Sequence, residues 1–229
     1  LTDARECGKV PEILVMATGR EPHPLLDALE DAVDKAGGDI VEMDVDILAK
    51  VPGKDNPQAV AGVFAEFDTS LSTIDRTAAP IWLVAQALRD PGNLGTMLRT
   101  GDAVGAGGLI LIDDCADPFS VEAVRASMGA IFTQKLVTAR WDEFLPWLRS
   151  GPGQLVAASL RDSTDYRTAP YAAPCFLMVG NESQGLPAAY EDACDLRVTM
   201  PMLGRADSLN AAVAGAVLAY EALAHLRTD

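Results

Sequence analysis

The chain has 229 residues, of which 49% are apolar and 22% charged, so it can bury a substantial core and does not have a disordered composition. Its net charge of −15 excludes a broadly basic nucleic-acid-binding module. Residues 1–79 carry 7 basic and 16 acidic groups and residues 80–229 carry 11 and 17, so any nucleic-acid site must be a local patch. No apolar run reaches the roughly 18–20 residues that cross a bilayer, and we expect no membrane association.

The cysteines and histidines are few and scattered. No Cys-x-x-Cys occurs among Cys7, Cys115, Cys175 and Cys194, and only two histidines accompany them. We therefore expect no metal site, and we expect the cysteines to be buried free thiols in a reducing cytoplasm. No signal peptide opens the chain, and because it begins at Leu1 rather than methionine we expect further sequence before it.

The first part of the chain predicts a small α/β unit. Residues 13–17 form a short apolar run that indicates a buried strand, and apolar residues recur at helical spacing from Pro24 until Gly37 and Gly38 stop the helix. Residues 40–45 and 59–64 indicate two more strands. We place this unit at residues 1–70 and a linker rich in Thr, Ser and Asp at 71–79.

From Pro80 the pattern becomes an alternation of strands and helices. The predicted strands are 81–85, 109–112, 132–138, 155–158, 175–179 and 196–200, and the predicted helices are 93–104, 121–128, 141–148 and 208–226. Such alternation implies a mostly parallel sheet with helices on both faces, here one domain over 80–229. The last helix carries small residues at helical spacing, which suits either tight packing on the sheet or a dimer interface.

Three segments of this domain place glycine, asparagine or proline where an apolar run ends. They are Asp90-Pro-Gly-Asn-Leu-Gly-Thr-Met-Leu-Arg99, Val179-Gly-Asn-Glu-Ser-Gln-Gly-Leu186 and Met200-Pro-Met-Leu-Gly-Arg-Ala-Asp-Ser-Leu-Asn210. An α/β protein exposes backbone to ligands at these points, so the three segments predict one active site.

Each polar residue in these segments can be interpreted either as a structural residue or as a functional one. Asn93 suits a helix N-cap, and Arg99 suits either a solvated surface or the stabilisation of negative charge. Glu182 is the only charge in its turn, and Ser208 is an ordinary helix cap. Asn210, expected just inside the last helix, is less easily explained because asparagine is a poor helix-interior residue.

Several common motifs are absent from the sequence. It has no Gly-x-x-x-x-Gly-Lys-Ser/Thr phosphate loop, no Gly-x-Gly-x-x-Gly after a strand and no Gly-x-Ser-x-Gly elbow. His23 and His225 lie outside the three segments, which excludes a histidine-based triad.

Together the three segments resemble the signature motifs of the SpoU/TrmH family of RNA ribose 2′-O-methyltransferases, within the SPOUT superfamily. The resemblance covers residues from about 80 to 226, in order and spacing. It implies a parallel-sheet α/β domain with a deep trefoil knot, a homodimer, and bound S-adenosylmethionine. Residues 1–70 resemble, more weakly, the ribosomal-protein-like RNA-recognition domain of many members.

The resemblance also implies roles for individual residues. Arg99 matches the catalytic arginine, and the site is completed by Asn93, Glu182, Ser208 and Asn210. The expected cofactor-binding residues are Gly180, Met200, Leu209, Val179, Met202, Ala158 and Asn210. Because arginine is nearly always protonated, Arg99 is better suited to electrostatic stabilisation than to general-base chemistry.

An acidic dimer has to bind RNA through localised cations. The candidates are Arg89, Arg99, Arg125, Lys135 and Arg205. Met200 and the pair Ala211-Ala212 stand where the family more often has isoleucine and Val-Ser, and these changes affect packing rather than the functional positions.

The leading interpretation is a cytoplasmic ribosomal-RNA methyltransferase, because an N-terminal recognition domain is commoner in those members. A transfer-RNA ribose methyltransferase is the alternative within the same class. A catalytically idle RNA-binding or ribosome-assembly protein and a nucleotide-binding α/β protein outside the family are the alternatives from other classes.

Overall fold

The computed structural model describes residues 1–48 and 60–227, which form two compact units. Unit one is Leu1–Phe67 and unit two is Asp68–Asp229. The division falls after Phe67, so the segment 71–79, expected to be a linker, belongs to the second unit.

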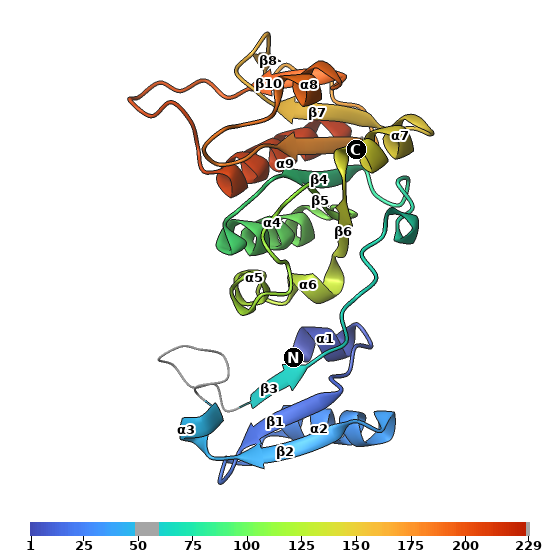
Figure 1. Ribbon diagram of the computed structural model, residues 1–229, viewed down its shortest axis with the longest axis vertical. Helices are drawn as coiled ribbons and strands as arrows, with labels where there is room; N and C mark the ends of the chain where they lie inside the picture. Colours follow the sequence, from blue (N-terminus) through green and yellow to red (C-terminus); the bar gives the residue numbers. More distant parts are fainter. Residues whose placement is uncertain (49–59, 228–229) are drawn as a thin grey trace. The chain divides into compact units, whose positions relative to one another are not determined.

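Unit one contains a three-stranded sheet with the order β2-β1-β3 (Figure 1). Strand β1 (Ile13–Ala17) pairs in parallel with β2 (Asp39–Met43) and antiparallel with β3 (Val60–Val63). The helices of this unit are α1 (Thr2–Glu6), α2 (Pro24–Ala36) and α3 (Val45–Leu48). The three predicted strands and the long helix are therefore confirmed as elements, but β2 ends at Met43, since Val45 already begins α3, and β3 ends at Val63. Ala59 lies outside the described residues.

Local sequence explains why α2 begins and ends where it does. Proline fixes the first helical position, and the His23 side chain accepts a hydrogen bond from the backbone N–H of Leu25. Gly37 adopts the left-handed conformation with a φ of 75°, which ends the helix. Leu29 and Val33 then pack on Leu14 and Met16 of β1, forming a small core.

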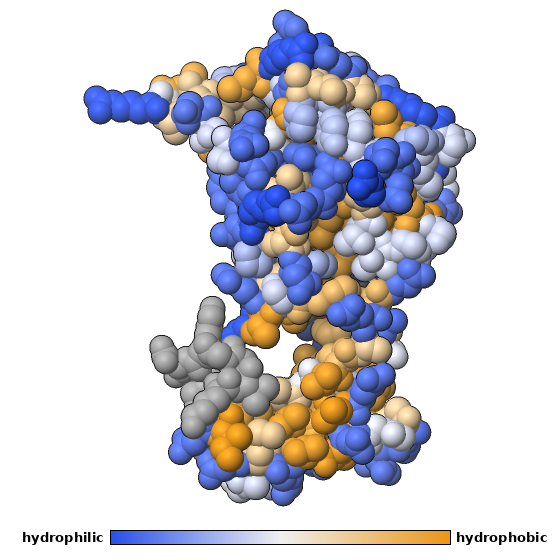
Figure 2. All heavy atoms as spheres, in the orientation of Figure 1, coloured by the Kyte–Doolittle hydropathy of each residue, from blue (hydrophilic) through white to orange (hydrophobic). Residues whose placement is uncertain are grey.

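Apolar side chains are also exposed on unit one, as Figure 2 shows. The exposed apolar residues are Leu25, Ile40, Val41, Val45, Ile47 and Val63. This unit thus covers one face of its sheet with α2 and leaves the edge strand β2 accessible.

Unit two contains a seven-stranded sheet with the order β6-β5-β4-β9-β7-β10-β8, and every pairing in it is parallel. The strands are β4 (Ile81–Gln86), β5 (Gly108–Ile112), β6 (Lys135–Ala139), β7 (Gln154–Ala158), β8 (Thr164–Asp165), β9 (Cys175–Val179) and β10 (Leu196–Thr199). The helices are α4 (Pro91–Val104), α5 (Val121–Ala126), α6 (Ala130–Thr133), α7 (Trp141–Arg149), α8 (Ala188–Asp192) and α9 (Ala211–Leu226), with a 3-10 turn at Leu71–Thr73.

Helices cover both faces of this sheet, as the alternation predicts. Trp82 and Val84 of β4 face α7, where they join a core with Phe144 and Phe176. On the other face α4 packs against α9, and a Cβ added at Gly215 would lie 3.4 Å from the Met97 side chain. The α/β class and the parallel sheet are therefore confirmed.

The largest difference from the predicted strand boundaries is at β6. Residues 132–133, expected to begin a strand, belong to α6, and β6 starts only at Lys135. Helix α6 begins at Ala130, after the N-cap residue Gly129, which has a φ of 95°. The short elements α1, α3, α8 and β8 were not predicted, because two to five residues show too little periodicity.

Arg76 anchors the segment before β4, residues 68–80, to helix α7 within unit two. Its guanidinium donates to the carbonyls of Leu148 and Trp147, at 2.8 and 2.6 Å, and lies 4.0 Å from the Trp147 ring centroid. Arg76 therefore caps the carboxyl end of α7, which explains why this stretch is packed rather than extended.

Gly95 allows α4 and α5 to approach closely. A Cβ built at Gly95 would lie 2.3 Å from the carbonyl oxygen of Ala123 and 2.6 Å from the Cβ of Ala126. The glycine in the first segment is thus explained by helix packing, and it need not expose backbone to a ligand.

We predict that Gly95→Ala lowers the free energy of unfolding of unit two by about 1–3 kcal/mol, because α5 has to move to admit the methyl group. Urea denaturation measures this change. Gly204→Ala is the matched control, since no atom lies within 4 Å of a Cβ at Gly204. Equal stability of the two variants would contradict the packing role.

Candidate active site

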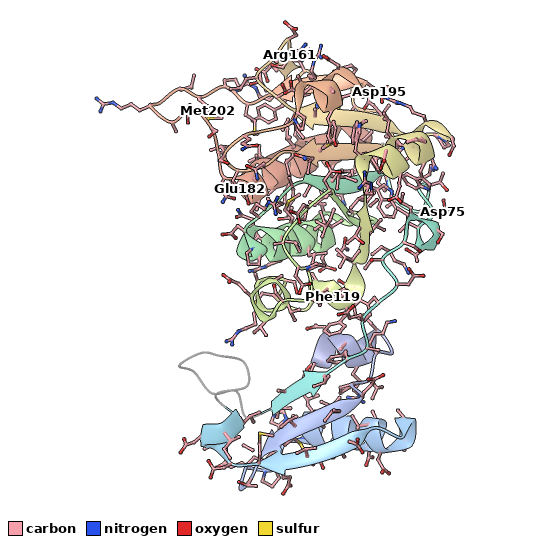
Figure 3. All side chains as sticks on the ribbon, viewed as in Figure 1. Asp75, Phe119, Arg161, Glu182, Asp195 and Met202 are labelled. Atoms are coloured by element: carbon pink, nitrogen blue, oxygen red, sulfur yellow. The ribbon has the colours of Figure 1, made fainter. Side chains whose placement is uncertain are left out.

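The three segments meet at the carboxyl edge of the sheet in unit two. Segment 90–99 follows β4, segment 179–186 follows β9, and segment 200–210 joins β10 to α9. Because every strand pairing is parallel, these strand ends share one edge. In Figure 3, Met202 lies on the projecting loop between β10 and α9, and Glu182 lies on the same side of the unit.

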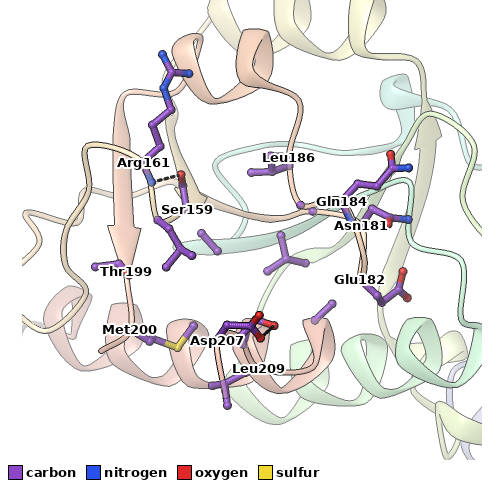
Figure 4. Close-up of a pocket in the computed structure, with 18 of the residues that line it drawn as sticks. Ser159, Arg161, Asn181, Glu182, Gln184, Leu186, Thr199, Met200, Asp207 and Leu209 are labelled. Atoms are coloured by element: carbon purple, nitrogen blue, oxygen red, sulfur yellow. Dashed lines mark hydrogen bonds between the residues drawn. The ribbon is translucent and has the colours of Figure 1, made fainter. Parts of the chain in front are cut away.

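A pocket of about 440 Å³ opens at the ends of β7, β9 and β10 (Figure 4). Most of the predicted site residues line it. They are Ala158, Val179, Gly180, Glu182, Met200, Met202, Ser208 and Leu209. The remaining three, Asn93, Arg99 and Asn210, do not line the pocket.

A chain of side-chain hydrogen bonds joins the three segments. Asn210 Nδ2 donates to Asn93 Oδ1 at 2.8 Å, and Asn93 Nδ2 donates to Glu182 Oε1 at 3.2 Å. Since each of these residues comes from a different segment, the chain fixes the segments relative to one another. The structure thereby brings three of the five predicted catalytic residues into direct contact.

Glu182 is the acceptor for several N–H groups at the start of α4. Besides Asn93, the backbone N–H groups of Arg89 and Asp90 donate to its carboxylate at 3.3 and 3.2 Å. Burial would raise the pKa of Glu182, but hydrogen bonds from its own backbone N–H, Asn93, Arg89 and Asp90 outweigh burial and lower the pKa below 4.5. The side chain is therefore an anion at neutral pH.

The helix caps differ from the sequence prediction. Asp90, rather than Asn93, caps α4 by accepting from the backbone N–H of Asn93 at 2.7 Å. Asn93 lies three residues after this cap, within α4, so its side chain is not needed for capping and can reach Glu182. Ser208 does not cap α9 either.

Asn210 itself is the cap of α9, which begins only at Ala211. Its Oδ1 accepts from the backbone N–H groups of Ala212 and Val213 at 3.0 and 3.2 Å. Placing Asn210 inside the last helix was therefore wrong, and capping removes the difficulty of an asparagine there.

Arg99 lies on α4 with an exposed side chain. Within residues 1–48 and 60–227, no carboxylate forms an ion pair with it. Its charge is thus available to an external group, and it lies six residues after Asn93 on the same helix.

The other predicted RNA-binding cations are scattered over unit two. Lys135 and Arg205 are exposed, and Arg125 is half-buried on α5. Arg89 forms an ion pair with Asp114 at 2.6 Å, so part of its charge is neutralised.

Sequence reasoning missed Asn181, which shapes the loop after β9. Its Oδ1 accepts from the backbone N–H groups of Ser183 and Gln184, and its Nδ2 donates to the carbonyl of Ala87 at 2.8 Å. An asparagine two residues before a serine is a signal for such a turn. Gly180 is equally constrained, because a Cβ there would lie 2.4 Å from the carbonyl carbon of Gly185.

The cysteines are free, but their burial varies. Cys175 is buried and Cys115 and Cys194 are half-buried, whereas Cys7 is exposed, so the expectation of burial was wrong for Cys7. Burial raises the pKa of both Cys175 and Cys194 to about 12, which leaves them as thiols at neutral pH. Over residues 1–48 and 60–227, no three His, Cys, Asp or Glu side chains gather as metal ligands, and no helix is long and apolar enough to cross a membrane.

Residues 80–220 match the model of the SpoU rRNA methylase family. The chain belongs to this family. The resemblance expected from the three segments is thereby confirmed, and the matched region contains the pocket and the hydrogen-bonded chain.

Two similar proteins and one solved structure each cover 80% or more of this chain. A 23S rRNA (guanosine(2553)-2′-O)-methyltransferase, RlmP, of Bacillus subtilis is 32% identical over 96% of this chain and 82% of its own length. A 23S rRNA (uridine(2479)-2′-O)-methyltransferase of Streptomyces viridochromogenes is 32% identical over 80% of this chain and 58% of its own. The crystal structure of an AdoMet-bound rRNA methyltransferase from Sinorhizobium meliloti superposes with a TM-score of 0.91 at 36% identity, over 99% of this chain and 84% of that one.

We predict that Glu182→Gln lowers the free energy of unfolding by about 1 kcal/mol at neutral pH, a small effect because the carboxylate is largely exposed. The folded pKa is lowered, so the stabilisation is present above pH 4.5 and is lost as the pH falls through the folded pKa. Urea denaturation of both proteins at several pH values measures the difference. A difference that grows on acidification would contradict the role of the ionised carboxylate.

Proposed function

We propose that this protein transfers a methyl group from S-adenosylmethionine to a ribose 2′-hydroxyl in ribosomal RNA. The observation that carries the proposal is the set of hydrogen bonds that runs from Asn210 through Asn93 to Glu182 beside a pocket, in a protein that matches the SpoU family model. The relatives from Bacillus subtilis and Streptomyces viridochromogenes are named as 23S rRNA 2′-O-methyltransferases.

These names favour ribosomal RNA over the transfer-RNA alternative. The likeness to RlmP extends over 96% of this chain and so includes unit one, for which we propose the RNA-recognition role. A catalytically idle protein is disfavoured because Asn93, Arg99, Glu182, Ser208 and Asn210 are all retained.

The pocket has the size and lining that the cofactor requires. Its volume of about 440 Å³ lies within the usual range for small-molecule sites. Small and apolar side chains form its walls and suit a flat purine ring. These wall residues are Ala158, Val179, Leu186, Val198, Leu209, Ala211 and Ala214.

Backbone groups in the pocket supply the polar contacts. Gly180 and Met200 directly follow β9 and β10, and Leu209 lies just before the N-cap of α9, so the sheet does not use all the N–H and C=O groups at these positions. We assign cofactor binding to these three, with Val179, Met202 and Ala158 beside them. When bound, S-adenosylmethionine supplies a methyl group that its sulfonium has already activated.

The chain's own residues then have to act on the ribose hydroxyl. A hydroxyl is a weak acid, and the oxygen becomes more negative as it attacks, so a fixed cation lowers the barrier. Arg99 supplies that cation, while Asn93 and Asn210 orient the hydroxyl, and Ser208 lines the pocket. Glu182 acts through Asn93, whose side-chain amide it holds in position.

A homodimer is supported by the outer face of α9. Val213 and Tyr220 are 48% and 56% exposed, and Ala216 and Val217 are half-buried between them. These residues recur at helical spacing and form an apolar stripe that a second copy would cover. The free thiols are consistent with a cytoplasmic location.

We also propose that the carboxyl-terminal part of unit two carries the trefoil knot of the SPOUT superfamily. Strand β10 lies beyond β7, yet the helix that follows it returns across the sheet to pack on β9, β4 and α4. A chain that doubles back past its own earlier loops is what a knot requires.

We predict that Arg99→Ala binds S-adenosylmethionine with unchanged affinity but lowers kcat about 100- to 1000-fold, because it removes charge stabilisation of the attacking oxygen. Transfer of labelled methyl to total RNA measures kcat, and calorimetry measures cofactor affinity. Mapping the labelled ribose identifies the substrate.

Arg227→Ala is the control for this variant, since Arg227 is an exposed arginine at the far end of α9. Full activity of Arg99→Ala would refute the assigned role. If the unmodified protein failed to bind S-adenosylmethionine, the enzyme itself would be ruled out in favour of an idle RNA-binding protein.

We predict that Val213→Glu converts the dimer to a monomer, because a charge would be buried in the α9 interface. Sedimentation equilibrium measures the mass. Val121→Glu, at an apolar position on α5 that is 50% exposed, should leave the dimer intact. A monomeric unmodified protein, or a dimeric Val213→Glu variant, would contradict this interface.

A further inference from the structure

The pocket has a second polar group, which lies outside the three segments. Ser159 and Arg161 come from the loop after β7, and Glu191 comes from α8. Figure 4 shows Ser159 and Arg161 on the side of the pocket opposite Glu182.

Hydrogen bonds fix the Glu191 carboxylate in this wall. Ser159 Oγ donates to Glu191 Oε1 at 2.5 Å, and the backbone N–H of Arg161 donates to Ser159 Oγ at 3.0 Å. Arg161 Nη1 lies 3.6 Å from Glu191 Oε2, and Arg161 Nη2 lies 3.0 Å from Asp192 Oδ1. Arg161 is therefore shared by two carboxylates and lies closer to Asp192, so it offsets the charge of Glu191 only in part.

Glu191 is buried yet keeps acceptor capacity. Only 12% of its side chain is exposed, although it lines a pocket. A carboxylate has about four lone-pair sites, and a single hydrogen bond occupies one of them here. Buried acceptors gain most from a ligand that supplies a donor.

Tyr190, the residue before Glu191, anchors α8 to neighbouring parts of unit two. The Tyr190 ring stacks on Trp141 with centroids 3.9 Å apart, and its hydroxyl donates to Asp113 Oδ2 at 2.8 Å. Burial, aided by that hydrogen bond, raises the pKa of Tyr190 to about 12, so the hydroxyl remains a donor at neutral pH. The short helix α8 thus presents Glu191 in a fixed position before any ligand binds.

The position of Glu191 in the pocket determines which part of the cofactor it can contact. In the proposed function methyl transfer takes place beside Glu182, so the sulfonium of a bound cofactor would lie at that end of the pocket. The adenosyl arm of S-adenosylmethionine is longer than the methionine arm, so it is the part of the cofactor that would extend to the opposite wall. Its donors are the ribose hydroxyls and the exocyclic amine of the purine.

We infer that Glu191, positioned by Ser159, accepts a hydrogen bond from an O–H or N–H donor of the adenosyl half of the cofactor. This inference rests on the proposed function, because it assumes that the pocket holds S-adenosylmethionine. It assigns a role in cofactor specificity to residues that belong to none of the three segments.

Calorimetric titration with S-adenosylmethionine and with 5′-methylthioadenosine, which lacks the amino-acid portion, tests the inference. Glu191→Ala should weaken both ligands by about 10- to 100-fold, the loss of one hydrogen bond to a charged group. Analogues of 5′-methylthioadenosine without the 2′-hydroxyl or without the exocyclic amine identify the donor, since the analogue that lacks it should bind Glu191→Ala and the unmodified protein equally.

Asp192→Asn is the matched control. Asp192 also pairs with Arg161 but does not line the pocket, so its substitution should leave both affinities unchanged. An equal loss in Asp192→Asn, an unchanged affinity in a folded Glu191→Ala, or a loss confined to S-adenosylmethionine would overturn the inference. Failure of the unmodified protein to bind S-adenosylmethionine would instead overturn the proposed function.

Discussion

The parallel orientation of all seven strands in unit two is the constraint on which the site depends. Parallel strands place all their carboxyl ends at one edge, so the loops after β4, β7, β9 and β10 emerge together. The middle of the sheet order, β4-β9-β7-β10, sets segments far apart in sequence beside one another. Hydrogen bonds such as that from Asn93 to Glu182, which spans 89 residues of sequence, follow from this arrangement.

Much of this could be predicted because the strands of unit two are short, apolar and separated by turn residues. The runs at 81–85, 109–112 and 175–179 agree with β4, β5 and β9 to within one residue. The polar residues of the three segments could be identified as a set, since each follows such a run. Their contacts could not be identified, because a sequence does not reveal that Asp90 caps α4 and so leaves the Asn93 amide free.

Other features depend on contacts that leave no local pattern. Gly95 has the same appearance in sequence as a ligand-facing glycine, and only the approach of α5 shows its packing role. Glu191 lies in a five-residue helix and becomes noteworthy only beside Ser159, 32 residues earlier. The position of 68–79 on unit two likewise depends on Arg76 reaching the end of α7, a contact across more than 70 residues.

Asn210 performs two chemically distinct tasks with one amide group. Its oxygen caps α9, the helix with the apolar outer stripe, while its nitrogen donates to Asn93. One planar amide therefore serves both the start of the helix proposed as the dimer interface and the alignment of the proposed catalytic residues, and a 180° rotation of that amide would disrupt both sets of hydrogen bonds. Alanine at this position removes both tasks at once, whereas aspartate retains the capping oxygens and lacks the donor. Comparing the two substitutions distinguishes the effect of losing the α9 cap from the effect of losing the hydrogen bond to Asn93.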